Sequence, residues 1–486
     1  MLPVSVECGS IGYFSRMFRL DCGWHQACRA RQGIVNFCTA RRLRTAWRPA
    51  ALLALSISLL RPSSALAAEA AAETPADTRV SVAALLHESS RLQAWLASHS
   101  PEIRAARARL AQSSADTRQS RVLQNPVLDA SLSNVALGHT NPPGKSFNQI
   151  AIYNVGLSQT IELGKRGPRI AGAELREKSA GLQLLAAERD QLSSARFALG
   201  NALYRGLRVA IFEESLHDAE HGADLERTRF EQKALSGTEY DRLLLDLANL
   251  RADFDRERAE YSAALADCTA ALGAACELGG ARQDDLATTA PVDVTQASAG
   301  RLERRPDLQA LDVERQAAER DAELARGRSV PDLTFRLGYT HDDFTVSGDN
   351  LNTLSFGVAL PLPVFDRGQH DSSKALSRAQ ELHETRASLL LQARADLAGL
   401  VTRKATLEKV LDGIEHESLP RSSSVLQSTQ TAFDHGGVSL TDLLLARRTH
   451  IALQLTLLDE RFELFGIRNE LERVLGLSLH DEEKKP

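Results

Sequence analysis

The chain has 486 residues, of which 43% are hydrophobic and 25% charged, and its formal net charge is −5. Nine of its 58 basic and two of its 63 acidic residues lie before residue 68, so the remaining chain carries a net charge of −12. This acidic balance argues against nucleic-acid binding; it fits a conduit for cations, or simply solubility. Because no run of about 18 apolar residues follows residue 67, any membrane insertion there would have to use strands rather than helices.

Residues 1–67 are predicted to be an N-terminal extension and signal peptide. An apolar run at residues 50–60, too short to span a bilayer, follows four arginines and precedes Ala65-Leu66-Ala67, so we expect cleavage after Ala67. The long stretch before the run is unusual for a signal, and we expect translation to start nearer Met17 or Val35. No cysteine lies at the cleavage site, which argues against a lipid anchor.

The rest of the chain contains two copies of one pattern about 205 residues apart. Pro101-Glu102-Ile103 returns as Pro306-Asp307-Leu308, and residues 230–239 return as residues 433–442. Shared prolines, glycines and acidic residues in one order indicate duplication rather than chance periodicity. We therefore predict a first repeat with an equatorial linker at 68–300, a second repeat at 301–478, and a charged tail at 479–486.

The first copy is predicted to form helix, strand, strand and helix. Residues 85–124 are rich in helix formers, with Pro101 placed where a helix can begin. Residues 128–132 and 151–157 then alternate apolar with polar side chains, as half-buried strands do. A proline-free stretch at about 169–234 predicts a helix of unusual length, and a turn at 236–238 leads into a return helix.

The second copy repeats this order. Residues 333–340 and 354–362 alternate as strands, and residues 372–434 predict a second long helix with a kink at Pro420. A helix of some 60 residues runs roughly 90 Å, which predicts an elongated molecule. Four strands cannot close a barrel, so in a membrane several protomers would have to pool their strands. The alternative is a soluble sandwich packed on the helices.

Few residues suggest chemistry. The sequence lacks a phosphate-binding loop, a Cys-x-x-Cys after the signal and a nucleophile motif, so we predict neither enzymatic activity nor a cofactor. His217 and His221, four apart on a helix, could hold a metal, but without a third ligand a solvated face is favoured. His341, Asp342 and Asp343 end the third strand and are expected to face water. Cys268 and Cys276 either form a local disulfide or stay free.

These features together resemble the outer-membrane efflux family of the TolC type. The resemblance rests on the duplicated units, Asn125-Pro126 before the first strand, and Arg305-Pro306-Asp307-Leu308 opening the second copy, and it covers residues 85–478. Residues 159–166 (Gln-Thr-Ile-Glu-Leu-Gly-Lys-Arg) are particularly similar to the branch that exports cobalt, zinc and cadmium, although that branch usually has one more glycine before the lysine.

The resemblance implies a mainly α-helical homotrimer with a membrane β-barrel. Each protomer would give four strands to one 12-stranded barrel in outer-membrane lipid, and its coiled-coil helices would form a long tunnel through the periplasm. The tunnel would dock on a periplasmic adaptor protein and an inner-membrane resistance-nodulation-division pump. The function implied is passive efflux of divalent heavy-metal cations.

The resemblance also suggests a periplasmic aperture. In the family an acidic residue at the start of the last return helix narrows the closed end, and Asp442 matches that position, with Leu445 where the tightest members carry a second aspartate. A ring of three Asp442 side chains would attract cations, with Arg447 or Arg448 as neutralising partners. Asp442 could equally be an ordinary helix-start acid. Glu239 and Asp241 in the first copy's turn are the alternative gate residues.

Other functions stay open at this stage. A multidrug efflux channel or a duct for type I secretion would use the same fold with a different pump. A periplasmic adaptor is less compatible, because adaptors lack two copies of paired amphipathic strands.

Overall fold

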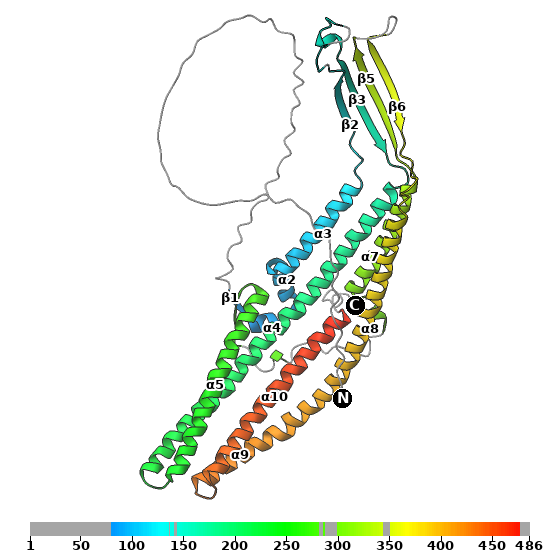
Figure 1. Ribbon diagram of the computed structural model, residues 1–486. Coiled ribbons are helices and arrows are strands. Elements are labelled where there is room, and N and C mark those ends of the chain that lie inside the picture. Colours follow the sequence, from blue (N-terminus) through cyan, green and yellow to red (C-terminus); the bar gives the residue numbers. More distant parts are fainter. Residues whose placement is uncertain are drawn as a thin grey trace, which may run out of the picture. The chain divides into compact units, whose positions relative to one another are not determined.

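The computed structural model describes residues 79–135, 137–139, 143–280, 285–286, 299–343 and 350–476. The predicted signal segment and the tail at 479–486 lie outside the described residues. Figure 1 shows the helices and the four-stranded sheet of the described part. The expectation of a mainly helical chain with four membrane-type strands, arranged as two helix-strand-strand-helix units, is confirmed in its element order.

Each unit begins with a helix that leads into two strands. The first unit comprises α3 (Pro101–Ser120), β2 (Val127–Ser133), β3 (Ile152–Ile161), α4 (Arg166–Glu231) and α5 (Gly237–Leu272). The second comprises α7 (Pro306–Arg326), β5 (Leu333–Asp342), β6 (Asn352–Ala359), α8 (Gln369–Gly413), a π-helical turn (Ile414–Ser418), α9 (Leu419–Asp434) and α10 (Leu440–Leu475). The shorter elements are β1 (Arg79–Ser81), α1 (Val82–His87), α2 (Ser89–His99), β4 (Ala275–Glu277) and α6 (Ala299–Leu302).

The stretch expected to be helical before β2 is divided into α1, α2 and α3. Pro101 opens α3 as predicted, because a proline at the first helical position lacks only an N–H that would be unpaired there. The Ser100 hydroxyl accepts a hydrogen bond from the Ile103 amide and caps the helix. Pro306 likewise occupies the first helical position of α7, but its N-cap residue, Arg305, makes no side-chain capping hydrogen bond.

The four strands form one antiparallel sheet in the order β2-β3-β5-β6. Its apolar face is open: Phe356 is 79% exposed and Leu128 is 71% exposed. On the opposite face, Asp129, Gly156, Gly338 and Ser355 are direct neighbours across the sheet. A side chain at Gly156 would lie 2.7 Å from the Asp129 carboxylate, so the glycine makes room for the acid. Within the described residues, β2 and β6 each have one edge without a partner strand.

The long helices follow the strands. Helix α4 has 66 residues, or about 100 Å at 1.5 Å per residue. Its counterpart is interrupted near the expected position: the π-helical turn at Ile414–Ser418 lies just before Pro420, which has no N–H to donate and sits in the first turn of α9. Among the described residues, no helix is both long enough and apolar enough to span a membrane.

The main core lies where α1, α2, α5 and α10 pack around α4. Leu199 and Leu203 of α4 are fully buried there together with Phe465 of α10. Gly200 allows α4 and α10 to approach, because a Cβ at this position would lie 2.2 Å from the Phe465 ring. This core fixes the point from which the α4–α5 and α9–α10 hairpins extend to their turns (Figure 1).

Candidate functional site

The two hairpin turns, which contain the predicted aperture residues, have the same local structure. Ser236 caps α5 and Ser439 caps α10, each in a capping box with the acid three residues later. The Ser439 hydroxyl donates to the Asp442 carboxylate over 2.7 Å and accepts from the Asp442 amide over 3.3 Å. The Ser236–Glu239 pair repeats both distances. The hydrogen bonds from Ser236 lower the pKa of the Glu239 carboxyl.

Even the turn backbones correspond. Lys233 has φ 61° and Gly436, 203 residues later, has φ 73°. Both amides donate 2.9 Å hydrogen bonds, to the carbonyls of Phe230 and Phe433 respectively. The first copy thus places a lysine in the left-handed region that the second gives to glycine, at a cost of roughly 1 to 2 kcal/mol.

The predicted aperture residues all lie at the starts of α5 and α10. Asp442 is exposed, Leu445 is 64% exposed, and Asp241, just after the first turn of α5, is exposed. The capping contacts show that Asp442 is a helix-start acid, one of the two roles the sequence suggested. Its role in narrowing an aperture remains a prediction.

Within this protomer, Arg447 and Arg448 make their contacts away from Asp442, and their role beside a ring of three Asp442 side chains stays a prediction. Arg448 pairs instead with Asp246 of α5, with 2.6 Å between Nε and Oδ1. Arg447 extends toward α4, where its Nη2 lies 3.7 Å from the position a Cβ would take on Gly222. The reason is geometric: both arginines lie one turn or more along α10, on faces that pack against the other hairpin.

The two hairpins are held together by apolar and polar contacts. Leu243 of α5 and Leu440 and Leu444 of α10 form a small buried cluster with Ala223 of α4. Beside it, Asp246 is 7% exposed, so its carboxylate depends on Arg448 for compensation. Arg242 donates to the Thr441 hydroxyl over 3.2 Å. The sequence did not single out Asp246, and it suggested Arg448 only as a partner of Asp442; an acid on the leucine-rich face of α5 was the available signal.

A second polar group joins α4 to the end of α9. Arg229 donates to Glu226 Oε1 over 2.9 Å, and its guanidinium carbon lies 5.6 Å from the centre of the Phe433 ring. Burial raises the pKa of the Glu226 carboxyl. Glu226 is only 6% exposed, and its Oε2 has no hydrogen-bond partner among the described residues.

These contacts border a cavity of about 800 Å³ between α4 and the α9–α10 hairpin. His217 and His221 line it, together with Glu226 and Arg447. Across the described ranges, no three His, Cys, Asp or Glu side chains converge as a ready metal site. His341, by contrast, is engaged at the sheet end, with Nδ1 2.7 Å from Asn352 Oδ1 and Nε2 3.4 Å from Asp343.

The motif that resembled the metal branch joins the sheet to the helices. Glu162 at the end of β3 accepts a 2.5 Å hydrogen bond from Arg169 of α4. Lys165 lies 2.8 Å from Asp332, which also accepts from the Leu163 amide over 3.2 Å. Because both pairs are half-buried or better, residues 162–169 fix how the first long helix leaves the sheet. The motif therefore has an architectural role in this chain.

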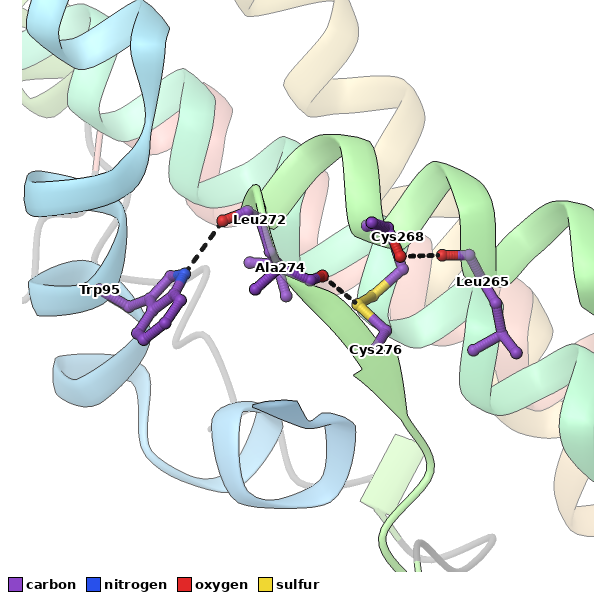
Figure 2. Close-up of a disulfide and its surroundings, with 7 residues drawn as sticks. Trp95, Leu265, Cys268, Leu272, Ala274 and Cys276 are labelled. Carbon is purple, nitrogen blue, oxygen red and sulfur yellow. Dashed lines mark hydrogen bonds between the residues drawn. A yellow bond between two sulfur atoms is a disulfide. The ribbon is translucent and has the colours of Figure 1, made fainter. Parts of the chain in front are cut away.

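Cys268 and Cys276, left open by the sequence, form a disulfide (Figure 2). It ties the last turn of α5 to β4, whose Cys276 pairs with Val80 of β1. Trp95 of α2 donates from its indole nitrogen to the Leu272 carbonyl over 3.0 Å. Cys268 is fully buried and Cys276 nearly so. The disulfide thus holds the start of the described chain against the end of the α4–α5 hairpin.

Comparison with known proteins agrees with this architecture. A model of the outer membrane efflux protein family matches residues 300–477. The cobalt-zinc-cadmium resistance protein CzcC of Cupriavidus metallidurans is 23% identical over 65% of this chain and 75% of its own length. The nickel and cobalt resistance protein CnrC of the same organism is 26% identical over 67% and 73%.

Solved structures confirm the fold. A structure of CusC superimposes with a TM-score of 0.67 at 18% identity, covering 80% of this chain and 92% of CusC. The Campylobacter jejuni CmeC outer membrane channel gives a TM-score of 0.66 at 15% identity, covering 80% and 85%. At these identities the likeness establishes fold alone. The family model thus assigns residues 300–477 to the outer membrane efflux protein family, and the two resistance proteins together with the shared fold extend the similarity over most of the chain.

Proposed function

We propose that this protein is the outer-membrane channel of a tripartite efflux system and passively conducts divalent heavy-metal cations to the exterior. The assignment of metal cations as the cargo rests on the match to two metal-resistance proteins over about two thirds of the chain. The match of residues 300–477 to the outer membrane efflux family supports a location in the outer membrane and a role as a conduit rather than an enzyme. It also argues against a periplasmic adaptor.

The sheet supports a homotrimer. An open edge in lipid leaves backbone N–H and C=O groups unpaired at several kcal/mol each, so β2 and β6 require partner strands. Three copies would supply 12 strands and pair each β6 with a neighbouring β2. The apolar face, with Phe356 and Leu128 strongly exposed, would then meet lipid, and the face bearing Asp129 would line the lumen.

The helices would extend into the periplasm. We infer that the hairpin turns meet a periplasmic adaptor and an inner-membrane resistance-nodulation-division pump, and that Asp442, with Leu445 nearby, narrows the closed aperture. The division into repeats at 68–300 and 301–478 is part of the same proposal. It is supported by the matching caps at Ser236 and Ser439.

Deleting the gene tests the cargo. The mutant should become more sensitive to cobalt, zinc, cadmium or nickel than to organic antibiotics, and the plasmid-borne gene should restore growth. A mutant that accumulates dyes and drugs but tolerates metals like the parent would move the protein to multidrug efflux. Cross-linking of outer membranes should yield a trimer; a monomer in the soluble periplasm would contradict the assembly.

A further inference from the structure

One face of α4 carries four potential metal ligands in the cavity beside the hairpins. Glu214, His217, Asp218 and His221 are spaced i, i+3, i+4 and i+7, so they lie within an arc of about 100° on the helix. All four line the cavity of about 800 Å³ between α4 and the α9–α10 hairpin. The pair of histidines considered from the sequence thus has carboxylates on the same face.

These side chains are available to a ligand. All four are exposed, and none makes a hydrogen bond or ion pair with another described residue. The other histidine of the cavity, His450, is already engaged, with Nδ1 2.9 Å from Ser422 Oγ. Because the four side chains do not converge in this structure, ligation requires rotation about their χ angles, which exposed side chains do readily.

The cavity is electrostatically suited to a cation. Four carboxylates line it against the two guanidinium groups of Arg229 and Arg447. One carboxylate oxygen, Oε2 of Glu226, is buried and lacks a hydrogen-bond partner among the described residues. A buried acceptor without a hydrogen bond destabilises the structure, and a hydrated cation nearby would reduce that cost.

We propose that His217 and His221, with a carboxylate from Asp218 or Glu214, bind one divalent transition-metal cation per protomer. Two histidines four residues apart on one helical face can place two imidazole nitrogens on one ion. Imidazole suits zinc, nickel and cobalt, whereas an all-carboxylate site suits magnesium or calcium. With three protein ligands, water completes the coordination, so the ion is exchangeable rather than structural. The choice of a metal as ligand rests partly on the proposed function; the ligand set does not.

Binding is tested with Co²⁺ and the purified full-length trimer in detergent. Co²⁺ reports nitrogen ligation through its d–d absorption, and titration gives stoichiometry and affinity. The parent should bind one ion per protomer. The H217A/H221A variant should bind at least about tenfold more weakly and lose the nitrogen-ligated spectrum, since even losing a group that only orients a ligand costs about that much.

Two further variants make the result specific. The E214Q/D218N pair should weaken binding and keep part of the imidazole spectrum. The H370A/H383A pair removes two exposed histidines of α8 that do not line the cavity, and should match the parent. All variants should retain the parent's circular dichroism, because the substituted side chains are exposed.

The outcome separates this site from the proposed cargo. Loss of Co²⁺ binding in H217A/H221A alone supports the site whether or not the deletion strain is metal-sensitive. Equal affinity and spectra in the parent, H217A/H221A and H370A/H383A overturn the site, and leave the proposed function standing if the deletion strain is sensitive to metals.

Discussion

Arg448 of α10 pairs with Asp246 of α5 across the boundary between the two hairpins. Asp246 is 7% exposed, whereas the Arg448 side chain is 61% exposed. The acid has therefore lost most of its hydration and depends on one arginine that is itself easily withdrawn into solvent. This asymmetry makes the pair a weak point in the contact between α5 and α10.

Replacing Arg448 with alanine should loosen that contact. A buried carboxylate left without its partner costs about 3 to 5 kcal/mol. If the hairpins narrow an aperture, single-channel conductance in planar bilayers should rise. Arg256→Ala is the control, because Arg256 pairs with Asp253 on the surface of α5. Adding Asp246→Ala to the Arg448 variant should recover stability. Unchanged conductance in Arg448→Ala would show that the pair has no part in gating.

Asp442→Ala should raise conductance and weaken block by divalent cations applied from the periplasmic side. Three carboxylates around an axis attract divalent ions, and their removal lowers that attraction. Glu239→Ala breaks the equivalent capping box at Ser236 and tests the alternative gate residue of the first turn. Both variants should lose roughly 0.3 to 1.5 kcal/mol of helix-cap stability, because each removes the N3 acid of a capping box. If both leave conductance and block at parental values, the gate must be sought at Leu445 or Asp241.

Arginine at Phe356 should reduce the folded protein recovered from outer membranes. A lipid-facing arginine near the bilayer midplane costs roughly 2 to 4 kcal/mol. Arginine at the adjacent Ser355 should be tolerated, because Ser355 lies on the opposite face next to Gly338, where there is no side chain to displace. Equal recovery of the two variants would rule out a lipid-facing sheet.

Removing the disulfide should free the start of the described chain. Cys268 and Cys276 close a short loop, so its loss should cost about 2 kcal/mol. The C268A/C276A variant should be cleaved faster by protease around β1, whose partner is β4. Reductant should accelerate cleavage of the parent and leave the variant unchanged. Equal cleavage of parent and variant would mean that Trp95 and the core hold this region without the disulfide.

Element type and order were predictable because they depend on local periodicity. The alternation at 333–340 and the proline at 306 each determine their element without tertiary information. The contacts between hairpins were not predictable in this way. Asp246 and Arg448 lie 202 residues apart, and nothing in the sequence around either residue predicts that they pair. Spacing along α10 suggested Arg448 as a partner of Asp442, whereas packing between helices brings Arg448 to Asp246 within the protomer.

The structural role of residues 159–169 could not be predicted from the sequence either. The sequence similarity of this segment suggested metal cations as cargo. In the structure, Glu162 and Lys165 form ion pairs that join the sheet to α4. Sequence similarity in such a segment reports shared architecture first. Specificity for a metal has to be sought elsewhere in the chain, as along α4.

The alternation in the strands also bears on how the chain reaches its destination. Within β2, β3, β5 and β6, apolar residues largely alternate with polar ones. None of β2, β3, β5 and β6 contains a long apolar segment of the kind that is retained in the inner membrane during export. Such strands can enter lipid only once pairing satisfies their backbone N–H and C=O groups, so the proposed barrel implies that insertion is coupled to assembly rather than to synthesis.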